Sequence, residues 1–243
     1  MIHSTTHKSA NRTKRTVFFV SRYWLAFFGI IFSIFVSLPF LAPVLMKFNL
    51  ENPARIIYSI YSFLCHQLPQ RSFFLFGKQF TYSLTEIKSV WLDTNNPLVL
   101  RHFIGTPGMG WKVALSDRMV SMYTGALFFI WFWYLVKNLI RPLSWQGLSL
   151  LSFPMALDGF THMFSDFAGL GLGFRDSHRW LATITNNAFS SAFYAGDGWG
   201  SFNSIMRLIT GFLFGVGIVW FVTPHINELF KEMETRYLQK SQQ

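Results

Sequence analysis

Three long stretches with almost no charged residues constrain the fold of this chain more than any other feature. They cover residues 24–46, 119–136 and 205–223. Each is close to the length of about 20 apolar residues that an α-helix needs to cross roughly 30 Å of bilayer hydrocarbon. Because a backbone in lipid must satisfy its own hydrogen bonds, we predict that these stretches are transmembrane helices.

A fourth stretch, residues 148–167, is equally long but is interrupted by Asp158 and His162. The whole chain is 51% hydrophobic and only 13% charged, whereas about 25% of the residues in an ordinary soluble domain are charged. These features predict an all-α, polytopic membrane protein. We expect four transmembrane helices within a single membrane domain that covers residues 24–224.

The basic residues are distributed unevenly around these stretches. Lys8, Arg12 and further basic residues lie within residues 1–23, which contain no acidic residue, and Lys137 and Arg141 follow the second stretch. Segments of this kind usually lie in the cytoplasm. The net charge of +10 therefore indicates contact with anionic lipid headgroups rather than with nucleic acid. We expect a multi-pass protein of a prokaryotic plasma membrane with both termini in the cytoplasm.

This orientation places two segments outside the membrane, residues 48–117 and 168–203. The first contains a helical pattern over residues 54–67, which reaches only about 20 Å and predicts an interfacial or re-entrant helix. At the end of the chain, residues 225–243 place apolar and charged side chains on opposite helical faces. This tail is predicted to be an amphipathic helix at the cytoplasmic surface.

Several polar side chains fall at the same predicted depth, near the outer ends of the spans. An ionisable group at the membrane centre costs roughly 2.5–3.5 kcal/mol on insertion scales, so groups of this kind usually serve a function. We therefore predict one shared polar cluster at the outer face. Its candidate residues are Cys65, His66, Arg71, Arg118, Tyr123, Asp158, Thr161, His162 and Arg207.

Asp158 and His162 are four positions apart and therefore share one face of the predicted helix. In one interpretation they handle protons or, together with His66, bind a metal ion, because a carboxylate often orients a metal-binding imidazole. In the other, Asp158 pairs with Arg118 or Arg207 and the cluster is a structural network. The spacing leaves both interpretations open and identifies no cofactor.

The lone cysteine, Cys65, is followed directly by His66. Adjacent residues on a helix point about 100° apart, so a buried thiol beside a hydrogen-bonded histidine is a simpler interpretation than a nucleophilic pair. Gly211 and Gly215 form a Gly-x-x-x-Gly pattern on the last span. This pattern predicts close packing against a neighbouring helix.

The polar residues also fall into four motifs. The motifs are Cys65-His66-Gln67, Ser116-x-Arg118-Met119-x-x-x-Tyr123, Asp158-Gly159-x-Thr161 and Asn203-x-x-x-Arg207-x-x-Thr210-Gly211. In combination they resemble a family of prokaryotic integral membrane proteins that is described as a domain of unknown function. That family combines a Cys-His-Gln motif with a Cys-x-Arg-Cys-Thr-Gly-x-Tyr motif.

The chain departs from the family pattern because Ser116 and Met119 stand where the family has cysteines. The resemblance implies a metal or redox centre of three cysteines and a histidine in the family, and the loss of two cysteines weakens that implication for this chain. Relative to the family pattern, residues 80–113 and 178–200 are additional segments on the outer face. Added loops over one face are typical of a lid or of a docking surface for another membrane protein.

Three functions remain open, and we rank them by how well they fit these observations. The first is a binding or accessory subunit whose outer-face polar cluster holds a ligand or stabilises a larger membrane assembly. The second is a membrane-embedded enzyme that acts on a lipid or quinone-like substrate, with or without a metal ion. The third is a small transporter, although no paired broken helices indicate inverted repeats.

Overall fold

A computed structural model describes the backbone of residues 2–241 and the side chains of residues 16 and 18–239. Basic side chains of the N-terminal segment that we expect to contact lipid, such as Lys8 and Arg12, lie outside the described side chains. Within this described part of the chain, three helices are long and apolar enough to cross a membrane. They are the Phe18–Lys47 part of α1 (Ile2–Lys47), all of α5 (Asp117–Val136), and the Phe202–Gln239 part of α9 (Phe202–Ser241).

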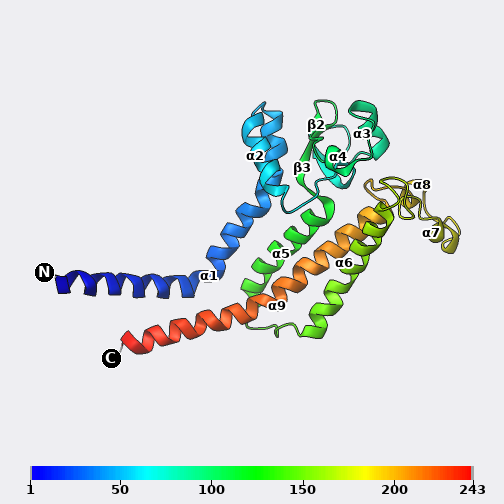
Figure 1. Ribbon diagram of the computed structural model, residues 1–243. Coiled ribbons are helices and arrows are strands. Elements are labelled where there is room, and N and C mark those ends of the chain that lie inside the picture. The colour runs from blue at the N-terminus through cyan, green and yellow to red at the C-terminus, as the bar shows by residue number, and fades with distance from the viewer. Residues whose placement is uncertain (1, 242–243) are drawn as a thin grey trace.

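The three helices contain the three nearly uncharged stretches of the sequence. The N-terminal part of α1 turns away from the rest of the helix, and both ends of the chain lie on the side remote from the small strands (Figure 1). The predicted amphipathic tail is a direct continuation of α9. It packs on α1, because Phe230 stacks on Trp24 at 5.1 Å and Tyr237 contacts Phe18 at 4.9 Å between ring centroids.

The fourth predicted span corresponds to α6 (Trp145–Asp166), which lies along α9. Its residues are less apolar than those of the other long helices, so it is not among the three helices that meet the length and composition criteria for a membrane span. Polar side chains explain this difference, since Asp158, His162 and Ser165 are buried on the α6 face that points into the protein. The structure thus shows a mostly helical protein with three candidate spans.

Helices α5 and α9 form the closest packed pair of the bundle. Gly211 and Gly215 allow this approach, because a Cβ atom at Gly211 would lie 2.6 Å from the carbonyl oxygen of Arg118, and one at Gly215 would overlap the carbonyl oxygen of Met122. On the facing helix, a Cβ atom at Gly125 would lie 2.9 Å from the carbonyl oxygen of Phe212. Both helix backbones therefore meet with no side chain between them.

The all-α prediction is wrong for the segment between α1 and α5, which contains a three-stranded antiparallel sheet. The strands are β1 (Ser72–Leu75), β2 (Gly105–Thr106) and β3 (Gly110–Ser116), in the order β1-β3-β2. β1 pairs with β3 with Ser72 opposite Ser116. β3 is buried along nearly its whole length, so it lacks the alternation of apolar and polar residues that identifies a half-exposed strand.

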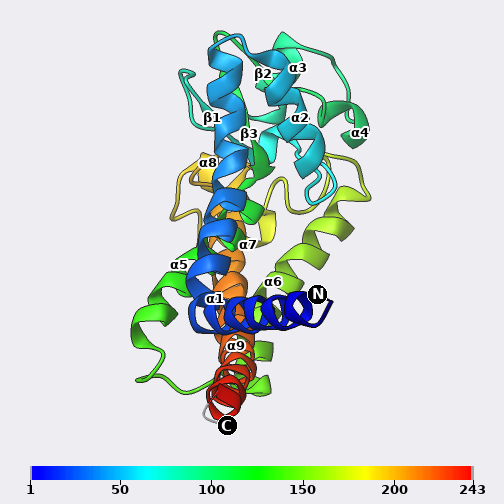
Figure 2. The same cartoon turned by 90° about the vertical axis from the view of Figure 1, so that its left-hand side faces the viewer.

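The short helix predicted at residues 54–67 is α2 (Glu51–Tyr61), which ends earlier than expected. Cys65 and His66 therefore lie in the loop that follows rather than at a helix end. α2 packs beside the end of α1 and against β3 (Figure 2). It buries Ile57 and Tyr61 but leaves Ile56 and Ile60 exposed.

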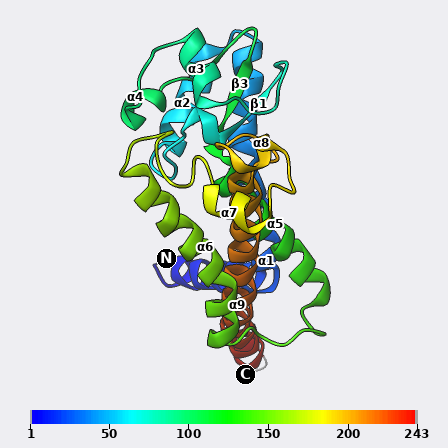
Figure 3. The same cartoon turned by 90° about the vertical axis from the view of Figure 1, so that its right-hand side faces the viewer.

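The remaining short elements belong to the two segments that lie between the long helices. They are the 3₁₀ helix η1 (Pro69–Arg71) and the helices α3 (Leu84–Val90), α4 (Pro97–Leu100), α7 (Arg179–Ile184) and α8 (Ser191–Tyr194). Leu170 of the second segment joins the core of the first, formed by Phe74, Ile87, Leu100 and neighbouring residues. Both segments gather at one end of the bundle (Figure 3). We call residues 48–116 and 167–201 the platform.

Candidate functional site

A network of buried ion pairs joins the platform to the long helices. It contains four arginines and four aspartates, so that its formal charges cancel. The arginines are Arg71, Arg118, Arg175 and Arg207, and the aspartates are Asp117, Asp158, Asp166 and Asp197. Because a buried charge without a partner is very costly, this pairing explains how so many ionised groups are retained at a membrane boundary.

Arg71 lies at the end of η1 and binds two carboxylates. Its Nη1 and Nη2 atoms donate to the two carboxylate oxygens of Asp166 at 2.8 and 2.7 Å, and its Nε donates to Asp197 at 2.9 Å. Burial alone would lower the pKa of Arg71, but Asp197 and Asp166 raise it above its usual value. Arg71 thus connects the first platform segment to α6 and to the second segment.

Arg207 occupies the corresponding central position on α9. Its Nε atom donates to both oxygens of Asp117 at 2.9 Å, and its Nη1 atom donates to Asp197 at 2.6 Å. Asp197 therefore receives hydrogen bonds from both Arg71 and Arg207. Burial alone would raise the pKa of Asp197, but the two arginines overcome this effect and lower it well below its usual range.

Asp158, on α6, is held between two further arginines. Its Oδ2 atom accepts from Arg118 at 2.6 Å, and its Oδ1 atom lies 2.8 Å from Arg175 Nη2. Arg175 also donates to Thr161 at 2.6 Å and to the side-chain oxygen of Asn203 at 3.0 Å. Of the two partners that the sequence suggested for Asp158, Arg118 is present, whereas Arg207 binds other aspartates.

His162 lies one turn from Asp158 and is buried beside Arg207, with 3.5 Å between His162 Nε2 and Arg207 Nη1. Its Nδ1 atom has no hydrogen-bond partner among the described residues. His66 faces the same network but its side chain remains exposed, although protein atoms surround it on most sides. The surrounding protein, followed by the charges of Arg71, Arg118 and Arg207, lowers the pKa of His66 to about 3.

Cys65 lies next to the network rather than within it. Its sulfur is buried and accepts hydrogen bonds from the backbone N–H groups of Ser116 at 3.3 Å and Gln67 at 3.4 Å. The Ser116 hydroxyl lies 3.3 Å from the same sulfur. Gln67 adopts a left-handed conformation with φ 52°, and its side-chain amide donates to the carbonyl oxygens of Tyr58 and Ala114. The Cys-His-Gln motif thus anchors the loop after α2 to β3.

A fully buried lysine, Lys112, lies on β3 close to this loop. Its Nζ atom donates to two carbonyl oxygens, that of Gln67 at 2.8 Å and that of Arg101 at 2.6 Å. Burial, the largest effect, lowers the pKa of Lys112 to about 7. The ammonium form is therefore poorly stabilised at this position.

Six of the predicted cluster residues come together in and around the ion network. They are Arg71, Arg118, Asp158, Thr161, His162 and Arg207. Tyr123 lies apart from them, because it packs edge-on against Phe35 of α1 at 5.2 Å between ring centroids. Among the described residues, no group of three or more His, Cys, Asp or Glu side chains is arranged to hold a metal ion. Both oxygens of Asp158 instead face arginines.

Four members of the network were not among the predicted cluster residues, namely Asp117, Asp166, Arg175 and Asp197. Arg175 and Asp197 lie in a segment that has no regular structure around them, so helical spacing could not associate them with Asp158 or Arg207. The number of charged residues in the sequence is the one signal that could have pointed to these members. The chain has only 11 acidic residues, and buried arginines near the outer ends of the spans require several of them as partners.

Most of this network lies in the part of the chain that matches a known family of proteins. Residues 108–221 match the model of a family described as "Predicted membrane protein (DUF2085)". An uncharacterised protein of Methanocaldococcus jannaschii is 26% identical over 176 residues, which cover 71% of this chain and 70% of that protein. The resemblance drawn from the motifs is confirmed: this is a membrane protein related to a family of unknown function. No solved structure matches the chain.

The DUF2085 match includes three of the four motifs but begins after Cys65-His66-Gln67. It contains Asp117, Asp158, Arg175, Asp197 and Arg207, and thus most of the ion network. Arg71 is supplied by the part of the chain that precedes the match.

Proposed function

We propose that this protein is an accessory membrane protein whose platform docks on another membrane protein. The observation that carries the proposal is the pairing of the network arginines with aspartates. Each of the four arginines of the network is paired with at least one aspartate, whereas an enzyme that binds an anionic headgroup needs cationic groups turned toward its substrate. A charge-balanced network of this kind fixes the platform rigidly on the helices.

The platform surface offers a cavity suited to a partner. A cavity of about 460 Å³ lies between α2 and the α4 region, and its lining includes Leu98 and the basic side chains Arg55, Arg101 and His102. Leu98 is 66% exposed, and Phe63, at the end of α2, is 90% exposed. Exposed apolar side chains beside basic groups favour an acidic, partly apolar segment of the partner.

The proposed membrane arrangement has four spans, with α6 as the fourth. This helix of 22 residues is about 33 Å long, enough to cross the hydrocarbon core. Leu150, Phe153, Leu157, Phe160 and Phe164 are exposed on it, and apolar side chains exposed along a helix of this length favour contact with lipid.

The proposed orientation follows the basic residues. Arg22 and Lys137 line one cavity together with Lys231 of the α9 tail, and Trp220 of α9 donates to the carbonyl oxygen of Arg141. The loop between α5 and α6 lies at the same end of the bundle as both chain ends (Figure 1). We infer that this end faces the cytoplasm of a prokaryotic cell and that the platform lies outside the plasma membrane. Cys65 is the chain's only cysteine, which makes this orientation simple to test. In a Cys65→Ala background, an impermeant maleimide added to intact cells should label a cysteine at Asn95 but not one at Gln239. The reverse pattern would refute the orientation.

The docking proposal is tested by site-specific photo-crosslinking in cells. A photoreactive amino acid at Leu98 should give one defined cross-linked product, and the same group at Val90, another exposed position on the platform, should not. Arg55→Glu should reduce the Leu98 product, whereas Lys88→Glu should leave it unchanged. Equal cross-linking at Leu98 and Val90, or no effect of Arg55→Glu, would contradict docking at this cavity.

The enzyme hypothesis retains one supporting observation, the buried His162 with its unpartnered Nδ1 atom. The readout is the growth phenotype of cells that lack the protein. If His162 handles protons, a His162→Asn variant should fail to rescue this phenotype although its Leu98 cross-link stays intact. An accessory role predicts that a variant loses rescue only when it also loses the cross-link.

A further inference from the structure

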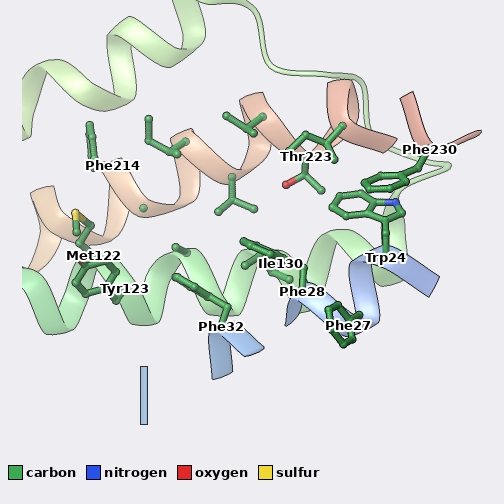
Figure 4. Close-up of a pocket in the computed structure, with 16 residues that line it drawn as sticks. Trp24, Phe27, Phe28, Phe32, Met122, Tyr123, Ile130, Phe214, Thr223 and Phe230 are labelled. Carbon is green, nitrogen blue, oxygen red and sulfur yellow. The ribbon is translucent and has the colours of Figure 1, made fainter. Parts of the chain in front are cut away.

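A long apolar groove opens between α1, α5 and α9. Its volume is about 560 Å³, and its wall is formed almost entirely by apolar side chains, including Phe28, Ile130, Phe214 and Ile218 (Figure 4). Ala126 and Gly215 contribute to the wall with little or no side chain, which leaves room for an occupant. Since these helices are the candidate spans, the groove lies at the depth of the hydrocarbon.

The groove is long enough to hold a lipid tail. On α9 its lining extends from Phe214 to Phe230, which corresponds to about 24 Å along the helix axis. One leaflet contributes about half of the roughly 30 Å hydrocarbon core. An acyl chain of one leaflet is therefore shorter than the groove and fits within it.

A polar, basic cavity adjoins the end of the groove where the chain ends lie. It has a volume of about 420 Å³, and its lining includes Arg22, Lys137 and Lys231 together with a single carboxylate, Glu234. Among the described side chains, none of these three cations forms an ion pair. Arg22 and Lys137 instead lie over the rings of Tyr23 and Tyr134, at 5.8 and 5.2 Å from the ring centroids.

The groove and the basic cavity are continuous along two helices. Trp24 of α1 borders both of them, and Phe230 and Lys231 of α9 are neighbours that line one each. Trp24 stacks on Phe230 at the junction (Figure 4). Aromatic residues at the level of the headgroups are typical of a membrane interface, so the junction lies where a lipid's glycerol would be.

We infer that this site binds one anionic phospholipid, with an acyl chain in the groove and its phosphate in the basic cavity. The apolar groove selects a hydrocarbon chain from the bilayer, and the excess of positive charge selects a negatively charged headgroup over a zwitterionic one. The inference is independent of the docking function and of the orientation of the protein, because it depends only on the helices and on the end that carries the basic residues.

The inference is tested by adding lipids to the purified full-length protein in detergent. The probes are dioleoyl phosphatidylglycerol and dioleoyl phosphatidylcholine, and native mass spectrometry measures how much of each lipid binds. The wild type should bind one phosphatidylglycerol at least tenfold more tightly than phosphatidylcholine. Ile218→Trp fills the groove and should weaken binding of both lipids at least tenfold. Leu157→Trp, on the exposed face of α6, is the matched control and should bind as the wild type does.

Charge variants test the contribution of the headgroup to binding separately from that of the acyl chain. Lys137→Gln combined with Lys231→Gln should reduce phosphatidylglycerol binding to the level of phosphatidylcholine, while Lys88→Gln on the platform should have no effect. Equal binding of the two lipids by the wild type would overturn the inference, as would unchanged binding by Ile218→Trp. Val222→Phe is a smaller change in the same groove and serves if Ile218→Trp does not fold.

Discussion

The sulfur of Cys65 lies 3.3 Å from the hydroxyl oxygen of Ser116, and Ser116 stands where the related family has a cysteine. The two positions are distant in sequence but are brought together because the loop after α2 packs on the end of β3. A second cysteine at this position would place two thiols in contact.

We predict that Ser116→Cys restores such a pair and forms a disulfide with Cys65 under mild oxidation. The loop closed by this bond is long enough for the cross-link to stabilise the protein by about 4 kcal/mol in the chain-entropy model. Thiol labelling after denaturation should find no free cysteine in the oxidised variant. Cys65→Ala with Ser116→Cys is the control and should keep one thiol; two labelled thiols in the single variant would refute the prediction.

Asp197 is predicted to be a sensitive carboxylate of the network, because it binds Arg71 at 2.9 Å and Arg207 at 2.6 Å. Asp197→Asn keeps the shape of the side chain but leaves both arginines with one charge partner fewer. Breaking a buried ion pair costs about 3–5 kcal/mol, so thermal unfolding in detergent should show a large loss of stability. Glu51→Gln removes the exposed pair with Arg55 and should cost less than about 1 kcal/mol; similar losses in the two variants would contradict the prediction.

The sequence predicts the helices of this protein better than its platform. The three nearly uncharged stretches identify their helices by composition alone, and the spacing of Asp158 and His162 correctly places both side chains on one buried face. These properties depend on residues close together in the chain. The pairing of β1 with β3 depends instead on residues on either side of a long intervening segment, and no local pattern in a fully buried strand reveals its partner.

The same distinction applies to the candidate site. Arg118, Asp158 and Arg207 are conspicuous because an ionisable residue near an apolar stretch is costly. Arg175 and Asp197 lie in irregular loops where a charged residue is ordinary, and only the fold shows that both are buried. Two members of the network were therefore invisible to a sequence argument, although Arg175 pairs with Asp158 and Asp197 pairs with both Arg71 and Arg207.

Lys112 should make the stability of the platform depend on pH. An unfolded lysine keeps its proton up to a pH of about 10.4, whereas the pKa of Lys112 in the folded protein is lowered by burial to about 7. Between these values the unfolded state binds more protons, so the free energy of unfolding should rise as the pH rises from about 7 to about 10. Lys112→Met should remove this rise in a series of thermal unfolding measurements. Lys78→Met changes an exposed lysine and should keep it; an unchanged pH profile in Lys112→Met would show that another group is responsible.

Gly215 is predicted to be essential for the contact between α5 and α9. An alanine in a helix interior is favoured over glycine by about 1 kcal/mol, so Gly215→Ala would stabilise an isolated helix. In the folded protein its Cβ atom would overlap the carbonyl oxygen of Met122 and lie 2.9 Å from the backbone nitrogen of Ala126. A backbone cannot move aside as a flexible side chain does, and overpacking typically costs 1–3 kcal/mol. The cost of overpacking should therefore exceed the gain in helix propensity, and Gly215→Ala should lower the thermal unfolding temperature. Gly108→Ala is the control, because a Cβ atom there meets no atom within 4 Å; equal unfolding temperatures for the two variants would show that the helices can separate without loss of stability.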